Sequence, residues 1–216
     1  LWLRIKAAEA LASIGDPAMK AVPELLELLA RVDKQNDPRG MQQRYFSFAL
    51  FDTRGGMLGR SLEGVDRDML YAAVRAGLKN EDGRARSSFG SVYRNLSLKE
   101  IEPLLPAIYQ AVAEPAPSGI MFADGIRVEG LQILATHHVE EGIKACVEYI
   151  GTQNKWASEK RTPELIKILL GYGAHAKSSI PQLRDIVRQF EAGEENFPKN
   201  LSLQKAVSYT HLRAHE

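Results

Sequence analysis

The fold is decided by residues 6–29, which read KAAEALASIGDPAMKAVPELLELL. Apolar residues recur here at spacings of three and four, which predicts two successive helices that each carry one apolar stripe. The first stripe is Leu3, Ala7, Ala10, Leu11 and Ile14, and the second is Met19, Val22, Leu25, Leu26 and Leu29. We expect the first helix to end at Gly15, and the second to begin with Asp16 as N-cap and Pro17 as its first residue. Pro23 lies inside the second run, which predicts a kink or a shifted helix start.

The same arrangement recurs near the other end of the chain. Five residues have a counterpart 158 positions later: Leu11 with Leu169, Gly15 with Gly173, Ala18 with Ala176, Pro23 with Pro181, and Leu29 with Val187. Four repeats of roughly 40 residues fit this interval, and that period is typical of two-helix repeats. We expect the intermediate repeats to begin near positions 41, 82 and 120.

Four further helix pairs are predicted from the apolar pattern. They cover 41–51 with 66–78, 83–96 with 98–112, 120–136 with 139–150, and 161–172 with 177–190. Ser97 followed by Glu100 is typical of a capping box. The expected buried residues are Ile101, Leu104, Leu105, Ile108 and Val112 in the third pair, and Leu165, Ile168, Leu169, Ile180, Leu183, Ile186, Val187 and Phe190 in the fifth. No segment alternates with period two between hairpin turns, so we predict an all-α fold without a sheet.

The first pair, through residues 6–18 and 22–26, resembles a HEAT repeat of the short bacterial type found in phycobilisome-lyase-like proteins. The fifth pair matches the HEAT pattern moderately, and the middle three pairs match it only in helix placement and period. The resemblance implies an α–α superhelix, or solenoid, of about five HEAT-like helix pairs over residues 1–192, followed by a tail or the start of another unit over 193–206. It also implies a surface for binding other macromolecules and, occasionally, an enzyme.

Both ends of the chain are unusual. Leu1 stands where a complete chain would begin with Met, and residues 1–6 read as helix interior without a capping residue, so we expect the N-terminus to be missing. Residues 207–216 read VSYTHLRAHE, which is similar to a translated frame of the transposase adapter used in sequencing-library preparation. We expect these ten residues to lie outside the natural sequence.

Composition excludes several classes of protein. The 216 residues are 44% hydrophobic and 25% charged with a net charge of +1, which is ordinary for a folded chain and unlike a disordered or fibrous one. The apolar runs are short and interrupted by charge, so no membrane span is predicted. Balanced charge argues against a strongly basic nucleic-acid binder. Cys146 is the single cysteine, which excludes an internal disulfide and any multi-cysteine metal site.

Two groups of residues could carry chemistry. Cys146 could be a nucleophile with His137 or His138, but its position between apolar residues favours packing in the core. The remaining candidates for metal ligands are His137, His138, Glu140, Glu141 and His175. Adjacent histidines on a helix point about 100° apart and no HExxH spacing is present, so we favour histidines that lie at a helix end.

Two loops and a set of basic residues could contact partners. The insert 52–61 holds three glycines without a phosphate-binding fingerprint, and either links two helices or contacts a partner. The loop 114–125 has an apolar cluster at Ile120, Met121 and Phe122, which either starts the next helix or anchors a partner. The basic residues are Arg67, Arg75, Lys79, Arg84, Arg86, Arg94, Lys155, Lys160, Arg161 and Lys167. Acidic residues are interleaved among them, which favours a solvated helix face over a continuous phosphate track.

We therefore predict a non-enzymatic protein-binding scaffold segment of a larger bacterial HEAT-repeat protein. The expected partner is a protein or peptide, and no catalytic, cofactor-binding or metal-binding residue is assigned. The alternatives are a HEAT-like module that binds nucleic acid, motivated by the arginines of the second and third pairs, and a bilin-lyase-like handler of a small ligand, which rests on the resemblance alone.

Overall fold

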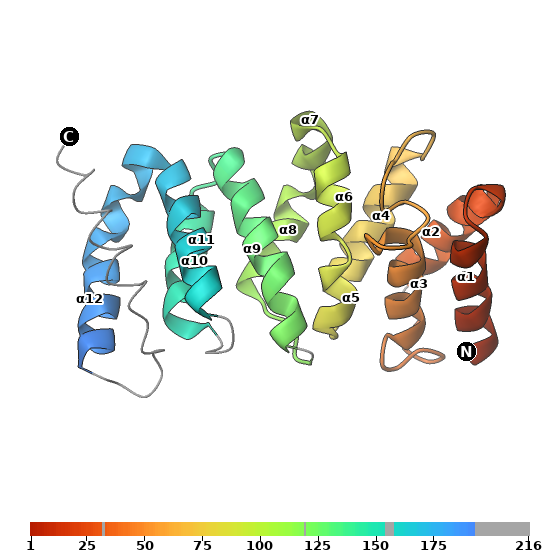
Figure 1. The fold of residues 1–216 in the computed structure, drawn as a ribbon, viewed down its shortest axis with the longest axis horizontal. Coiled ribbons are helices and arrows are strands. Elements are labelled where there is room, and N and C mark those ends of the chain that lie inside the picture. The colour runs from red at the N-terminus through yellow and green to blue at the C-terminus, as the bar shows by residue number, and fades with distance from the viewer. Residues whose placement is uncertain (32, 119, 154–157, 193–216) are drawn as a thin grey trace. The chain divides into compact units, whose positions relative to one another are not determined.

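A computed structural model describes residues 1–31, 33–118, 120–153 and 158–192 (Figure 1). The expected tail 193–206 and the adapter-like residues 207–216 lie outside these ranges. Within the described ranges the protein is all-helical and has no strand, which confirms the prediction of an all-α chain without a sheet. Asp82 and Ser118 form an isolated β-bridge. Every helix in this part of the chain is too short or too polar to span a membrane.

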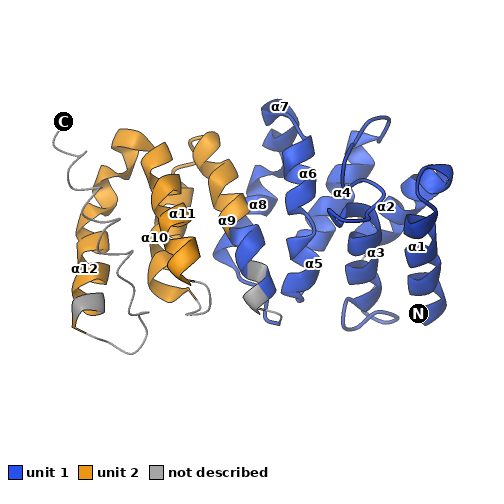
Figure 2. Cartoon of the chain, in the orientation of Figure 1, with its two compact units in different colours: residues 1–127 blue, residues 128–216 orange. Residues whose placement is uncertain are grey.

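The chain divides into two compact units, residues 1–127 and 128–216 (Figure 2). Unit 1 contains the helices α1 (Trp2–Ile14), η1 (Asp16–Ala21), α2 (Val22–Ala30), α3 (Met41–Phe51), α4 (Arg67–Leu78), α5 (Gly83–Ser87), α6 (Gly90–Asn95), α7 (Leu98–Ile101), η2 (Glu102–Leu104) and α8 (Leu105–Ala113). Helix α9 (Ile120–Thr136) runs across the boundary. Unit 2 then contains α10 (Glu141–Thr152), α11 (Ser158–Gly171), η3 (Gly173–Ser179) and α12 (Ile180–Glu191).

In unit 1, helices that are not consecutive in the chain pack against each other. Helix α1 contacts α3 and α3 contacts α5, while α2 contacts α4 and α4 contacts α8. The two sets form two rows of helices, with α2 and α4 behind α1 and α3 in Figure 1. The side chains buried in this unit are mainly aliphatic and aromatic, among them Ile5, Leu26, Leu29, Phe46, Leu50, Leu70, Val74 and Phe89. Each amphipathic helix of this kind buries its apolar stripe against its neighbours.

The first helix pair follows its sequence signals only in part. Helix α1 ends before Gly15, which has a φ of 73°, and α2 starts at Val22 with Pro23 in its first turn, as predicted. The prediction that Asp16 caps the second helix is wrong, because a 3₁₀ helix begins at Asp16 and no side-chain cap forms. The stripe expected on α1 is also wrong, since Leu3 is 84% exposed. Helix α1 carries apolar residues on several of its faces, so their spacing did not indicate that the face with Ile5 is the buried one.

The third helix pair is more broken than its apolar pattern indicates. The expected helix over 83–96 is divided into α5 and α6, and the expected helix over 98–112 is divided into α7, η2 and α8. Ser88 donates its hydroxyl to the carbonyl of Ala85 at 2.8 Å, and Ser91 donates to the carbonyl of Ser88 at 3.0 Å. Serine hydroxyls that bond nearby main-chain groups compete with helical hydrogen bonds, which accounts for the break between α5 and α6.

The predicted capping box at Ser97 is present. The Ser97 hydroxyl accepts the N–H of Glu100, and the Glu100 carboxylate accepts the N–H of Ser97. Hydrogen bonds from the Ser97 hydroxyl and N–H, and then from Arg67, lower the pKa of Glu100 to about 2. Because this lowered pKa belongs to the folded state, Glu100 stabilises the fold above its ordinary pKa, and that stability is lost as the pH falls toward 2.

Unit 2 is organised around α10, which contacts α11, η3 and α12. Tyr149, Leu165 and Tyr172 are buried there. The Tyr172 hydroxyl donates to the carbonyl of Val139 at 3.0 Å, directly beside Gly142. A Cβ atom at Gly142 would lie 2.2 Å from that hydroxyl oxygen, so glycine is what allows α10 to approach the tyrosine.

Substitution of Gly77 by alanine tests the close packing of α4 in unit 1. A Cβ atom at Gly77 would lie 2.1 Å from Cζ of Phe89, whose ring is fully buried and packs on Phe51 with centroids 5.2 Å apart. We expect Gly77→Ala to lower the free energy of unfolding by about 1–3 kcal/mol, measured by urea denaturation. The matched control is Gly125→Ala in α9, where a Cβ atom meets nothing within 4 Å, and alanine should stabilise the helix by up to about 1 kcal/mol. Equal stability of Gly77→Ala and the parent would contradict this packing.

Candidate functional site

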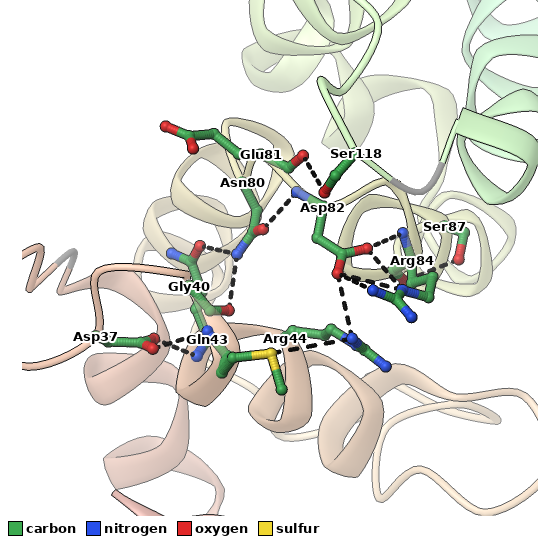
Figure 3. Close-up of polar contacts among 11 residues, drawn as sticks. Asp37, Gly40, Gln43, Arg44, Asn80, Glu81, Asp82, Arg84, Ser87 and Ser118 are labelled. Carbon is green, nitrogen blue, oxygen red and sulfur yellow. Dashed lines mark hydrogen bonds and ion pairs between the residues drawn. The ribbon is translucent and has the colours of Figure 1, made fainter.

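Buried polar side chains hold the loops at one end of unit 1 together (Figure 3). The Asn80 amide, on a residue only 5% exposed, donates to the carbonyl of Gly40 at 3.2 Å and to Oε1 of Gln43 at 2.7 Å. Gln43 in turn donates through Nε2 to the carbonyl of Leu29 at 3.1 Å. These bonds join the end of α2, the start of α3 and the turn after α4, and they satisfy groups that would be costly to bury unpaired.

The turn before α3 is shaped by Asp37 and Gly40. The buried Asp37 carboxylate accepts the N–H groups of Met41 at 2.7 Å and Gln43 at 3.2 Å, so it caps the first turn of α3. Gly40 has a φ of 60°, and a Cβ atom there would lie 2.6 Å from Nδ2 of Asn80. Both the backbone conformation and the close approach of Asn80 therefore require glycine at this position.

Asp82 lies between two arginines. Its carboxylate accepts Nη2 of Arg84 at 2.7 Å and Nη1 of Arg44 at 3.2 Å, and the Asp82 side chain is only 9% exposed. Burial by itself raises the pKa of Asp82, but hydrogen bonds from Arg84 and the positive charges of Arg44 and Arg84 lower it overall below its ordinary value of 3.8. The Arg44 guanidinium also lies over the rings of Tyr45 and Phe48, at 5.2 and 5.4 Å from their centroids.

The loop that follows α8 joins the same cluster through main-chain contacts. The N–H of Gly83 donates to the carbonyl of Ser118 at 2.8 Å, and the N–H of Ser118 donates to the carbonyl of Glu81 at 3.0 Å. Arg86 donates to the carbonyls of Asn80 and Glu114 at 2.7 and 2.6 Å, and burial lowers the pKa of its guanidinium. The loops between successive helix pairs are thus tied to one another in unit 1.

A pocket of about 260 Å³ lies beside this network, and we call it the loop-end pocket. Its lining comes from the end of α2, the loop before α3, the start of α3 and the end of α4: Leu28, Arg31, Asp33, Lys34, Asp37, Pro38, Arg39, Gly40, Gln42, Gln43, Ala76, Lys79, Asn80 and Glu81. Small-molecule sites typically enclose roughly 300–1,000 Å³, so this pocket better fits one or two side chains of a peptide. The pocket combines apolar atoms with charged groups of both signs.

The insert 52–61 is packed against α3 rather than extended as a linker. Its residues Met57 and Leu58 donate their N–H groups to the carbonyls of Ala49 and Leu50 at 2.9 and 2.6 Å, and Leu58 is fully buried. Cβ atoms at Gly56 and Gly59 would lie 2.5 and 2.4 Å from main-chain atoms of Asp52. The glycines therefore serve a tight turn that covers the end of α3.

The apolar cluster expected in the loop 114–125 is only partly described. Helix α9 begins at Ile120, as expected, but the side chains of Ile120 and Met121 lie outside the described residues. Phe122 is 51% exposed, and the Arg84 guanidinium lies 6.0 Å from its ring centroid. Phe122 therefore lies at the surface of unit 1 next to an arginine.

Most of the candidate basic residues in unit 1 bond within the chain. Arg67 pairs with Glu100 at 2.7 Å, Arg75 donates to the carbonyl of Pro103 at 2.9 Å, and Arg94 donates to the carbonyl of Gly90 at 3.3 Å. Arg84 and Arg86 bond as described above, and Lys79 lines the loop-end pocket. In unit 2, Arg161 is buried and donates to Gln153, Lys160 and Lys167 are exposed, and Lys155 lies outside the described residues.

Cys146 lies in the core, whereas His138 and His175 are exposed at the surface. Cys146 is fully buried, its thiol donates to the carbonyl of Leu165 at 3.5 Å, and burial raises its pKa to about 12. The imidazole Nδ1 of His175 lies 3.1 Å from Oε1 of Glu140 at the surface, and the ring centroids of His138 and His175 are 6.5 Å apart. Within the described residues no three His, Cys, Asp or Glu side chains gather closely enough to hold a metal ion.

The sequence analysis did not single out the polar residues that join the loops beside the loop-end pocket, which are Asp37, Gln43, Asn80 and Asp82. Asn80, Asp82 and Gly83 form a short polar turn, and Asp37 to Gly40 read DPRG, which is another turn signal. Asp82 is the N-cap of α5 and accepts the N–H of Arg84, so a capping search at this position could have found it. The long-range bonds of Asn80 to Gly40 and Gln43 leave no such local signal.

The observed arrangement defines an all-helical protein with stacked helices and a polar, loop-built site in unit 1. A comparison of the chain with protein families, with curated proteins and with solved structures found no match.

Acid titration tests the role of Asp82. Because its pKa is lowered in the folded state, Asp82 stabilises the fold above pH 3.8, and this stability is lost as the pH falls through the lowered value. We expect Asp82→Asn to cost roughly 2 kcal/mol at pH 7, with a difference from the parent that shrinks below pH 3.8. Urea unfolding across pH measures this, with the exposed Asp68→Asn as control. A difference that is the same at pH 7 and at low pH would refute the role of the ionised carboxylate.

Thiol reactivity tests the burial of Cys146. We expect the folded chain to react with Ellman's reagent only on the timescale of unfolding, because the thiol is inaccessible and its pKa of about 12 leaves almost no thiolate at neutral pH. In guanidinium chloride the same chain should release one equivalent of thionitrobenzoate at once. Rapid reaction of the folded chain would place Cys146 in a reactive site instead.

Proposed function

We propose that this chain is a protein-binding scaffold segment of a larger bacterial protein, built from about five HEAT-like helix pairs that stack as a solenoid. The observation that supports this most is the packing of unit 1, where α1 and α3 form one row and α2 and α4 form another. A single helix pair of this kind cannot bury its apolar face alone, so successive pairs share one core. Stacked pairs offer an extended surface on which a partner chain can lie.

The role of a binder rather than an enzyme is supported by the character of the candidate groups. Cys146 is enclosed in the core with a raised pKa, and the surface pair His175 and Glu140 is open to solvent. The loop-end pocket is smaller than a typical small-molecule site, and two of its polar side chains, Asn80 and Gln43, join loops. A pocket of this kind suits a side chain that projects from a partner protein.

Binding of nucleic acid is not our preferred function. The arginines that suggested it, such as Arg67, Arg75 and Arg86, bond to carboxylates and main-chain carbonyls of the chain itself. A phosphate track needs several neighbouring cations that are free to bind phosphate groups and so displace the counterions of the nucleic acid. The small-ligand alternative has no specific residue in its favour.

Selection from a display library of random linear peptides tests the proposed function. We expect the full chain to select peptides that compete with one another for a shared surface. Ala76 is half-exposed and lines the loop-end pocket, so Ala76→Phe should fill the pocket and weaken these peptides about tenfold or more, as measured by fluorescence anisotropy.

The matched control is Ala72→Phe, which places the same ring one turn earlier on α4 at an exposed position outside the pocket. This variant should bind the selected peptides like the parent. If no peptide is selected, or if both phenylalanine variants bind like the parent, peptide binding at the loop-end pocket is wrong. Circular dichroism and thermal melting establish that both variants are folded.

A further inference from the structure

The carboxylates in the lining of the loop-end pocket are already engaged by neighbouring groups. Asp33 accepts main-chain N–H groups of the turn that follows it, Asp37 caps α3, and Glu81 is paired with Lys34 at 2.8 Å. Hydrogen bonds from Asn36 and Lys34 lower the pKa values of Asp33 and Glu81, respectively. These carboxylates therefore already have partners within the chain, and none of them forms a described ion pair with Arg39 or Lys79.

Two cations of the pocket lining are left without such a partner. Arg39 in the loop before α3 and Lys79 after α4 are both exposed, and within the described residues neither forms an ion pair or hydrogen bond through its side chain. Arg31, the other arginine of the lining, is bonded to Glu27. Arg39 and Lys79 are thus two exposed cationic side chains, carried by two different segments of the lining, that are open to a carboxylate of a partner.

Apolar atoms lie beside these charges. Leu28 and Ala76, which are half-exposed, and Pro38 contribute to the same lining. A cavity of about 260 Å³ with this composition complements a carboxylate that is followed or preceded by an apolar side chain. Opposite charge gives the contact its specificity and its rate of encounter, whereas the apolar contact excludes water around it.

The walls of the pocket are fixed before a partner arrives. Asn80 bonds to Gly40 and Gln43, and Asp37 bonds to the start of α3, so the segments that carry Arg39 and Lys79 are held at a set separation. A preformed site loses little conformational entropy on binding, apart from that of the two long cationic side chains. This favours recognition of a short segment rather than of a large complementary surface.

We propose that the loop-end pocket binds an acidic segment of a partner protein, in which an Asp or Glu carboxylate is bound by Arg39 and Lys79 and an adjoining apolar side chain packs on Leu28 and Ala76. The proposal rests on the proposed function, because it names the chemistry of the partner at the same surface. The partner segment must therefore carry a carboxylate and an apolar side chain close together in its sequence.

The test has two readouts: the amino-acid composition of the peptides that the parent chain selects, and the loss of their binding when Arg39 and Lys79 are changed. We expect enrichment of Asp or Glu next to apolar residues, and binding that weakens as salt is added. The double variant Arg39→Glu with Lys79→Glu should weaken these peptides about tenfold or more in fluorescence anisotropy. The control, Lys20→Glu with Lys99→Glu, changes the net charge equally at exposed positions outside the pocket and should bind like the parent.

Each outcome decides between the proposals. Peptides that show no enrichment of acidic residues, or that bind the Arg39→Glu, Lys79→Glu variant like the parent, overturn the acidic-segment proposal and leave peptide binding standing. Failure to select any peptide overturns the proposed function itself. A single-stranded DNA oligonucleotide that displaces the peptides and binds more tightly would assign the two cations to phosphate instead. If charge reversal unfolds the chain by circular dichroism, Arg39→Gln with Lys79→Gln is the variant to compare, with the same expected direction.

Discussion

The side-chain amide of Asn80 is the constraint on which the loop end of unit 1 depends. It donates to the carbonyl of Gly40 and to Gln43, and its own carbonyl oxygen accepts the N–H of Asp82 at 2.9 Å. One buried side chain thus fixes the turn before α3 and the turn before α5. Because a buried amide that loses a partner is costly, separating the two turns is unfavourable. The loop-end pocket owes its shape to this coupling.

The rows of helices and the polar bonds between loops make different contributions to the structure of unit 1. The helices bury aliphatic and aromatic faces, such as those of Leu26 and Phe46, but this burial is non-directional and does not fix where the connecting loops lie. The polar bonds of Gln43 and Asp82 are directional, so they set the register between neighbouring loops. Asp82 adds an electrostatic requirement, because its carboxylate is stabilised only while Arg44 and Arg84 remain beside it.

Local signals predicted the elements better than the packing. Gly15 ended a helix, Pro23 shifted the start of α2, and Ser97 with Glu100 formed the capping box, because each of these depends on residues within one turn of the chain. Helix α3 begins and ends where the apolar pattern placed it, at 41 and 51. The buried face of α1 was misjudged, since Leu3 and Ile5 are equally apolar and only the position of α3 decides which of them is covered.

The sequence by itself determined that the chain is helical, where most helices lie, and that Cys146 packs in the core, because periodicity, capping and composition act over a few residues. Tertiary structure alone decided which charges are free. In the sequence, Arg67 and Arg86 resemble Arg39 and Lys79. In the structure, however, Arg67 and Arg86 are bound by groups up to 33 positions away, whereas Arg39 and Lys79 line the loop-end pocket. The physical reason is that an ion pair is set by distance in space, and residues remote in the chain are brought together only when the helices stack.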